Sequence, residues 1–152
     1  MPNPHAAARF QSAEAYERLM GRWSRRPAPL LIQIGGLADG DRVLEVGCGT
    51  SSLTFTCPRN PNVAAVTGID VTEPYLEFAR ARNSGPKINF RQADAQALPF
   101  EDNSFDRAFS MLVLQFIPDA ARAVAEIRRV VRHGGTVTAA IWDVYGGTPH
   151  TT

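Results

Sequence analysis

Apolar runs rich in β-forming residues recur along this chain, and polar, turn-forming or helical segments separate them. Each run ends in a polar or glycine-containing stretch, as strands bounded by turns do. Strands that alternate with helices are typical of parallel crossover connections, so the pattern predicts an α/β, doubly wound domain. The expected strands cover residues 43–46, 63–70, 88–92, 105–113 and 136–142.

Three segments show the helical spacing of apolar residues and follow a residue suited to N-capping. Those capping residues are Ser12, Thr72 and Asp119. In the third segment, Val124 and Ile127 belong to an apolar stripe, while its arginines fall outside the stripe or near the helix end. The expected helices cover residues 14–23, 73–82 and 120–132.

The most informative stretch runs from residue 42 to residue 54, where the first strand meets a Gly-x-Gly turn. Gly47 and Gly49 let a ligand approach bare backbone, and the Thr-Ser-Ser cluster after them is suited to opening a short helix. The lysine of a phosphate-binding loop is missing. Glu45 stands where a dinucleotide site has an apolar residue, and a carboxylate there attracts an ammonium or sulfonium group.

Residues 43–50, Val-Leu-Glu-Val-Gly-Cys-Gly-Thr, resemble the first motif of the class I S-adenosylmethionine-dependent methyltransferases. The later segments resemble the small-molecule branch of that family, often called type 11, and the similarity extends from Tyr16 to about Trp142. The resemblance implies a Rossmann-like parallel sheet of strand order 3-2-1-4-5, with S-adenosyl-L-methionine as the cofactor. It also implies an enzyme that transfers a methyl group by direct in-line displacement.

Acidic residues follow the second and third expected strands. Asp70 lies 21 positions after Gly49, close to the spacing at which a carboxylate meets ribose hydroxyls, and it can accept two charge-assisted hydrogen bonds from a diol. The alternative is a capping role for Asp70. The resemblance implies that Asp94 accepts from the adenine amino group and that the Ala95 N–H meets a ring nitrogen. The expected cofactor-binding residues are Tyr16, Arg22, Glu45, Gly47, Gly49, Asp70, Val71, Asp94, Ala95, Ser110 and Met111.

Residues 10–36 are expected to form a helical cover, with Pro27 and Pro29 breaking its first helix. The part from residue 16 to residue 24 is similar to a family segment that supplies an aromatic hydroxyl and an arginine near the methionine carboxylate. This similarity indicates Tyr16 and Arg22. The alternative is that Tyr16 simply packs the helix against the domain.

In an open parallel sheet, a ligand crevice forms where the strand order reverses, here between the first and fourth strands. Ser110 and Met111 should therefore face the glycine turn. Gln115 falls where relatives often carry a polar residue over the transferable methyl, so it is the candidate for orienting a substrate. An exposed glutamine in a turn is the alternative.

Composition restricts the partners. The 152 residues indicate one domain, in which residues 1–9 form a flexible tail and residues 42–142 the α/β core. A formal net charge of +1 gives no electrostatic reason to expect nucleic acid or an anionic membrane. Two cysteines and the lack of a signal or membrane-spanning run indicate a cytoplasmic protein. No His/Cys/Asp cluster has metal-ligand spacing, so no metal is expected.

The residues after the fifth strand differ from the family, whose members continue through a further helix and a β-hairpin. Residues 143–152 cannot supply them, so we expect a sheet that lacks the hairpin and exposes its fifth strand to pairing, for example in a homo-oligomer. A fragment, a shortened natural protein and a domain completed by self-association all remain open. The first functional hypothesis is a methyltransferase acting on a small-molecule acceptor. The alternative is a non-catalytic S-adenosylmethionine- or S-adenosylhomocysteine-binding domain or a truncated fragment.

Overall fold

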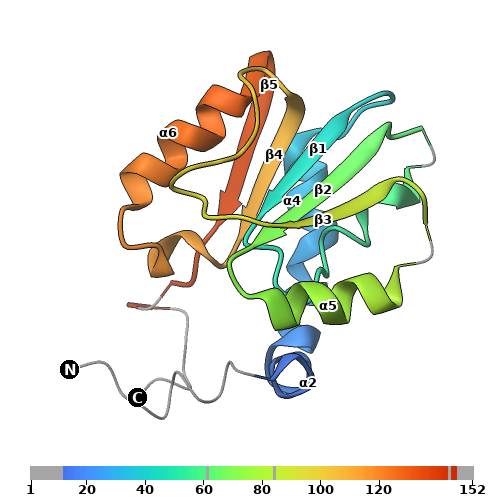
Figure 1. The fold of residues 1–152 in the computed structure, drawn as a ribbon, viewed down its shortest axis with the longest axis vertical. Coiled ribbons are helices and arrows are strands. Elements are labelled where there is room, and N and C mark those ends of the chain that lie inside the picture. Colours follow the sequence, from blue (N-terminus) through green and yellow to red (C-terminus); the bar gives the residue numbers. More distant parts are fainter. Residues whose placement is uncertain (1–11, 61, 84, 144, 147–152) are drawn as a thin grey trace.

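Five parallel strands form a sheet of order β3-β2-β1-β4-β5 in the computed structural model, which describes residues 12–60, 62–83, 85–143 and 145–146 (Figure 1). The expected doubly wound α/β fold and its strand order are confirmed. Parallel pairing joins every pair of neighbours in the sheet. The strands are β1 (Arg42–Val46), β2 (Ala65–Asp70), β3 (Ile88–Gln92), β4 (Phe105–Met111) and β5 (Val131–Ala140).

The start of β5 differs from expectation, because the strand begins at Val131 rather than at Thr136. Helix α6 (Ala120–Val130) accordingly ends two residues earlier than expected. Val131 pairs with Phe105, and a register shift precedes the pairing of Arg107 with Thr136. Residues 131 and 132, which were expected to end the helix, therefore belong to the irregular start of β5.

The N-terminal cover is helical from Ala13 to Gly35. It consists of α2 (Ala13–Tyr16), the π-helical turn η1 (Glu17–Gly21), α3 (Arg22–Arg25) and α4 (Pro27–Gly35). The Ser12 hydroxyl accepts a hydrogen bond from the Ala15 N–H at 3.3 Å, which confirms the expected N-cap. The first run of helix ends at Arg25, as the prolines predicted, and Pro27 occupies the start of the new helix α4, where a missing N–H costs nothing.

The helix expected immediately after the glycine turn is not formed. Turns follow Ser51 instead, and then a short 3-10 helix, η2 (Cys57–Arg59). Ser51 has a φ of 76°, in the left-handed region, which is incompatible with a regular right-handed helix. The Thr54 N–H and hydroxyl both donate to the Glu45 carboxylate. The Glu45 carboxylate therefore accepts the hydrogen bond that the Thr54 N–H would donate to a backbone carbonyl in a helix.

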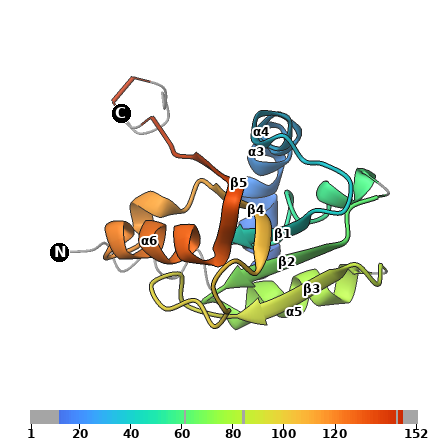
Figure 2. The same cartoon turned by 90° about the horizontal axis from the view of Figure 1, so that it is seen from above.

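Helices cover both faces of the sheet (Figure 2). On one face, Ile127 of α6 packs in a cluster with Leu44 of β1. On the other, Leu31 of α4 packs in a cluster with Val43 and Phe109. The alternation of Val43 and Leu44 between the two clusters follows from the period of two in a strand. Helix α5 (Glu73–Arg82) packs against β2 and β3.

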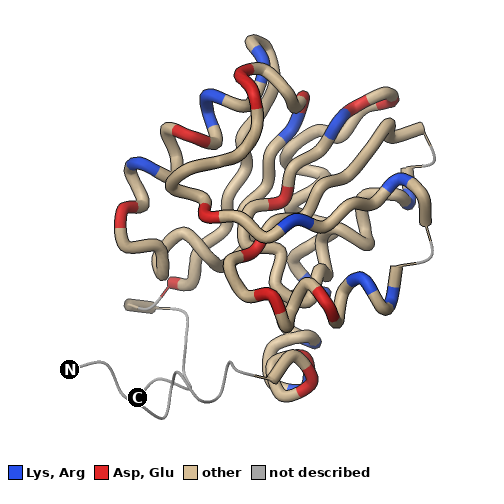
Figure 3. Tube along the Cα trace, in the orientation of Figure 1, with Lys and Arg blue, Asp and Glu red and all other residues tan. Residues whose placement is uncertain are grey.

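The carboxyl ends of the strands meet beneath the N-terminal cover. The N–H groups of Gly47 and Cys48 both donate to the Ile69 carbonyl, which joins the glycine turn to the end of β2. The Leu112 N–H donates to the Ala140 carbonyl at 2.7 Å, which joins the ends of β4 and β5. Helix α2 lies beside α5 at this end of the sheet (Figure 1). Charges of both signs are interspersed along the trace (Figure 3).

Candidate cofactor-binding site

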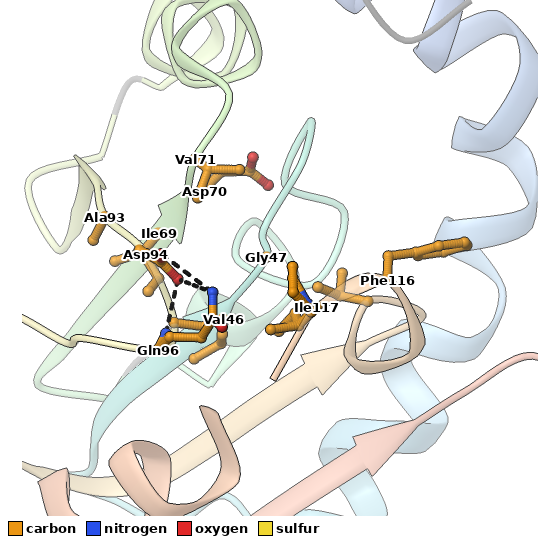
Figure 4. Close-up of a pocket in the computed structure, with 13 residues that line it drawn as sticks. Val46, Gly47, Ile69, Asp70, Val71, Ala93, Asp94, Gln96, Phe116 and Ile117 are labelled. Atoms are coloured by element: carbon orange, nitrogen blue, oxygen red, sulfur yellow. Dashed lines mark hydrogen bonds between the residues drawn. The ribbon is translucent and has the colours of Figure 1, made fainter. Parts of the chain in front are cut away.

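A cavity of about 340 Å³ lies at the carboxyl ends of β1, β2 and β3 (Figure 4). Its volume falls within the usual range for small-molecule sites, and it is placed where an open parallel sheet binds its ligands. The expected residues Gly47, Asp70, Val71, Asp94 and Ala95 all line it. Residues that the sequence reading did not assign to the site complete the lining, namely Val46, Ile69, Ala93, Gln96, Val113, Phe116, Ile117 and Pro118.

Gly47 must be glycine for two reasons that the structure makes visible. Its φ is 72°, in the left-handed region that side chains rarely adopt. A Cβ at this position would also collide with the side chain of Val113. Gly47 therefore lets the turn lie directly against Val113, the second residue after β4, and both residues line the cavity.

The Asp70 carboxylate connects two loops at the edge of the cavity. Its Oδ2 accepts from the Gly49 N–H at 2.9 Å, and its Oδ1 accepts from the Thr72 N–H at 2.9 Å. The Thr72 side chain, expected to be the cap of α5, makes no capping hydrogen bond. Asp70 thus holds local backbone and also lines the cavity, so the two roles weighed for it are compatible. Each carboxylate oxygen retains a further lone pair for a ligand.

Asp94 lies on another side of the cavity and is held by its neighbour Gln96 (Figure 4). The Gln96 backbone N–H donates to Asp94 Oδ1 at 2.8 Å, and its side-chain amide donates to the same oxygen at 3.1 Å. The hydrogen bond from the Gln96 backbone lowers the pKa of Asp94 below its usual value. The carboxylate is therefore ionised near neutral pH and ready to accept a hydrogen bond.

A second, much smaller cavity of about 10 Å³ adjoins the glycine turn on the side of the N-terminal cover. Gly47 lines both cavities. The Ser51 hydroxyl is buried here beside the Cys48 thiol and has no conventional hydrogen-bond partner among the described residues. A buried hydroxyl left in this way indicates a place for a polar ligand group. The expected residues Tyr16, Glu45 and Met111 line this small cavity, together with Ser24, Cys48, Thr50 and Ser52.

Glu45 is almost completely buried in the wall of the small cavity. Burial raises its pKa to about 8, although the Thr54 hydrogen bonds favour the ionised form, and the nearby Asp70 carboxylate raises the pKa further. Burial also raises the pKa of the Cys48 thiol. Glu45 is thus protonated near neutral pH until a positive charge approaches it.

The N-terminal cover is attached directly to the glycine turn. The Thr50 hydroxyl donates to the Glu17 carboxylate at 2.6 Å, and Arg25 forms an ion pair with the same carboxylate. The Tyr16 ring packs on the Tyr75 ring of α5 with centroids 4.9 Å apart. Burial raises the pKa of Tyr16, so its hydroxyl stays protonated and can donate a hydrogen bond.

Four expected site residues line neither cavity. Gly49 belongs to the turn, and its N–H donates to the Asp70 carboxylate. Arg22 is exposed, and its guanidinium stacks over the Trp23 ring at 5.1 Å instead of lining the small cavity. Ser110 is buried, and its hydroxyl donates to the Val46 carbonyl at 3.2 Å, so it joins β4 to β1. Gln115 is exposed in the 3-10 turn η3 (Leu114–Phe116), and the neighbouring Phe116 lines the larger cavity. A helical turn presents successive residues in different directions, which the sequence alone did not resolve.

In the part of the chain that the structure describes, no group of three or more His, Cys, Asp or Glu residues is arranged to hold a metal ion. None of the described helices combines the length and apolar character needed to cross a membrane.

Comparison with known proteins gives one family match, described as a methyltransferase domain and covering residues 44–139. An uncharacterized protein of Mycobacterium tuberculosis is 36% identical over 120 residues, which are 78% of this chain and 43% of that protein. The chain thus spans less than half the length of such relatives.

Two solved structures are also similar. An S-adenosylmethionine-dependent methyltransferase from Mesorhizobium loti superposes with a TM-score of 0.68 at 27% identity, over 74% of this chain and 52% of that one. The [4+2]-cyclase SpnF superposes with a TM-score of 0.70 at 34% identity, over 76% of this chain and 43% of that one. The similarity therefore includes proteins named for different reactions.

Proposed function

The chain belongs to the family of S-adenosylmethionine-dependent methyltransferases, and on that premise we propose that it transfers a methyl group to a small-molecule acceptor. One observation carries the proposal most directly. Gly47 lines two cavities, a larger one lined by Asp70 and Asp94 and a smaller one lined by Glu45 and Ser51. This division matches a cofactor with a nucleoside at one end and a charged amino acid at the other.

The larger cavity fits the adenosine part. In our assignment, Asp70 accepts from the ribose hydroxyls with lone pairs left free by the Gly49 and Thr72 N–H groups. Asp94 accepts from the adenine amino group, and Ile69 and Val113 supply apolar surface for the ring. Val71 and Ala95 complete the wall. The absence of a Cβ at Gly47 lets the Val113 side chain pack directly against the turn, beside the proposed ligand.

The smaller cavity would hold the methionine part. The Ser51 and Tyr16 hydroxyls are suited to its carboxylate, and Glu45 is suited to its ammonium or sulfonium charge. A volume of about 10 Å³ is too small for that group, so we propose that the N-terminal cover moves outward to admit it. The π-helical turn η1 between α2 and α3 is a suitable place for such a movement.

The chain would contribute positioning rather than covalent catalysis. When bound, the cofactor supplies an electrophilic methyl, whose bond to sulfur breaks as an acceptor lone pair bonds to it, with the electron pair staying on sulfur. Met111 in the lining of the smaller cavity and Val113 in the lining of the larger one would present apolar surface to the bound cofactor. Gln115 is proposed to orient the acceptor from the rim, and the proton of the acceptor goes to bulk water.

The direct test is turnover with S-adenosylmethionine against a panel of small acceptors carrying hydroxyl, amine, thiol or carbon nucleophiles. Formation of S-adenosylhomocysteine together with a methylated acceptor is the expected result. A matched Asp70→Ala variant should lose this activity, whereas Val124→Ala on the exposed side of α6 should retain it. Cofactor hydrolysis without a methylated product would contradict the proposal.

A second candidate is a domain that binds the cofactor or its demethylated product without transferring methyl. One observation favours this candidate, namely the similarity to a protein named as a [4+2]-cyclase. Saturable binding with no methyl transfer to any acceptor would support this candidate over the first.

The remaining parts of the proposal concern location and assembly. We propose a cytoplasmic protein that acts on a small molecule rather than on nucleic acid or a membrane, in keeping with its net charge of +1.

Among the described residues, β5 pairs with β4 alone, and Val137 on β5 is 45% exposed. We propose association of two chains through this edge, which sedimentation velocity at several concentrations would detect.

A further inference from the structure

An open apolar groove of about 440 Å³ lies between the N-terminal cover and the ends of β4 and β5. We call it the tryptophan groove, because the two tryptophans of the chain, Trp23 and Trp142, both line it. Most of the rest of its lining is aliphatic or proline. Those residues are Pro27, Leu30, Leu112, Ala140 and Ile141.

The groove leaves a large amount of apolar surface in contact with water. Leu30 and Ile141 are each 61% exposed, and Trp23 is 40% exposed. Exposed apolar side chains that gather in one place are characteristic of a binding surface, whereas single ones are ordinary. The volume of the groove also falls within the range of small-molecule sites.

The groove and the small cavity that we assign to the methionine part of the cofactor are lined in part by residues that are neighbours in sequence. Trp23 lines the groove and Ser24 lines the small cavity, while Leu112 lines the groove and Met111 the small cavity. Residues joined by one peptide bond have Cα atoms about 3.8 Å apart, so the two linings come close together at two places. Leu112 has a φ of 64°, a strained conformation of the kind that clusters at functional sites.

The charges around the groove disfavour a cationic occupant. The Arg22 guanidinium already lies over the Trp23 ring at 5.1 Å, and Arg26 lines the groove itself. Asp143 also lines it, but its carboxylate accepts from the Tyr145 and Gly146 N–H groups. Two indole rings with aliphatic neighbours favour a flat, largely apolar molecule, because aromatic rings gain from stacked or edge-to-face packing beyond simple burial.

We propose that the tryptophan groove binds the aromatic body of an uncharged methyl acceptor, and that the outward movement of the N-terminal cover proposed above lets its nucleophilic atom reach the transferable methyl past Met111 and Leu112. This inference rests on the proposed function and adds the chemical class of the acceptor to it. In this proposal an indole ring of the groove stacks on the aromatic ring of the acceptor, and the side chains of Leu30 and Ile141 contact that acceptor ring as well.

Nuclear magnetic resonance can test the groove directly, because the chain has two tryptophans and both line it. Nitrogen-labelled protein would be titrated with naphthol, with its saturated counterpart decahydronaphthol, and with ethanolamine. We expect naphthol to shift both indole N–H signals saturably, decahydronaphthol to bind more weakly, and ethanolamine to shift neither. Equal binding of naphthol and decahydronaphthol, or no saturable shift with naphthol, would overturn the aromatic assignment.

A pair of variants separates the groove from general effects on folding. Leu30→Asp places a charge in the groove, and Val124→Asp places the same charge on α6, at a residue that is also exposed. We expect Leu30→Asp to weaken naphthol binding by about tenfold or more, since an apolar contact is lost and a carboxylate must be desolvated. Val124→Asp should leave it unchanged, and unaltered naphthol binding in Leu30→Asp would contradict the proposal.

Two controls distinguish this inference from other outcomes. Calorimetric binding of S-adenosylhomocysteine should be equal in the wild type and in both variants. Naphthol binding by a chain that binds neither form of the cofactor would refute methyl transfer while supporting the aromatic ligand class. A dimer that Leu30→Asp converts to a monomer, in a wild type that does not bind naphthol, would show that a second copy occupies the groove and would overturn the proposal.

Discussion

The Asp70 carboxylate accepts a hydrogen bond from the Gly49 backbone N–H at 2.9 Å, so the last residue of β2 holds the glycine turn that follows β1. The same carboxylate accepts from the Thr72 N–H at the start of α5. One side chain therefore organises two loops of the larger cavity before any ligand is bound. Substitution of Asp70 should accordingly change both binding and stability.

We predict that Asp70→Ala weakens cofactor binding by about a hundredfold or more, since hydrogen bonds to a charged group contribute about 1.5–3 kcal/mol each. The free energy of unfolding should also fall by about 1–3 kcal/mol, because the Gly49 and Thr72 N–H groups lose their acceptor. Calorimetry with S-adenosylhomocysteine and urea unfolding measure the two effects separately. Wild-type affinity in a destabilised variant would refute the ribose assignment.

Gly47→Val should abolish cofactor binding, because a side chain there strains a φ of 72° and collides with Val113. The milder Gly47→Ala should bind weakly and have a lower melting temperature. Adding Val113→Ala to Gly47→Ala relieves the collision but not the backbone strain, so stability should recover only in part. Normal affinity in Gly47→Val, measured by calorimetry, would contradict the site.

The stability of the chain should depend on pH through Glu45. Its pKa is raised from 4.5 to about 8 by burial, so the folded chain keeps a proton that the unfolded chain releases. The resulting stabilisation is complete below about pH 4.5 and is lost as the pH rises to about 8. Urea unfolding between pH 4.5 and pH 8 should show that the free energy of unfolding falls less steeply with pH in Glu45→Gln than in the wild type. An identical pH dependence in the variant and the wild type would exclude Glu45 as the cause of the fall.

Cofactor binding should release a proton near neutral pH. A positive charge beside Glu45 favours the carboxylate, so its pKa falls when the ligand binds. Calorimetry in buffers of different ionisation enthalpy counts the protons released. The count should be larger for S-adenosylmethionine, with its sulfonium, than for S-adenosylhomocysteine, and should vanish in Glu45→Gln. No proton release by either ligand would mean that Glu45 serves only to hold Thr54.

Gln115→Ala should leave cofactor affinity within about twofold of the wild type, since Gln115 is exposed and lines neither cavity. Turnover with an identified acceptor should fall, because the variant loses its proposed orienting contact. Phe116→Ala is a matched comparison that removes a side chain from the larger cavity and should weaken cofactor binding. A large loss of affinity in Gln115→Ala would place that residue in the cofactor site.

The strands were predictable because each one is a run of apolar, β-forming residues that ends in a polar or glycine-containing stretch. Helix α5 was likewise predicted with the bounds that it has, Glu73–Arg82. The missed elements depend on tertiary contacts. No local signal showed that Ser51 would adopt a φ of 76°, that Glu45 would bind the Thr54 N–H, or that Val131 would pair with Phe105 and lengthen β5.

The candidate site was predictable where a motif fixes the backbone, as at Gly47 and Asp70. It was not predictable where the direction of a side chain decides whether the residue lines a cavity. Arg22 is an example, because it points to solvent and stacks on Trp23. Gln96 lines the cavity without any motif to mark it. Gln96 could have been found from its position two residues after Asp94, where a backbone N–H can return to the carboxylate.

The central claim is that the two cavities lined by Gly47 together hold one cofactor, and calorimetric titration of the 152-residue chain tests it most directly. S-adenosylmethionine and S-adenosylhomocysteine should each bind saturably with one site per chain, and NAD should not bind. Asp70→Ala should remove the binding. A folded chain that binds neither ligand, or that binds NAD equally well, would contradict the account.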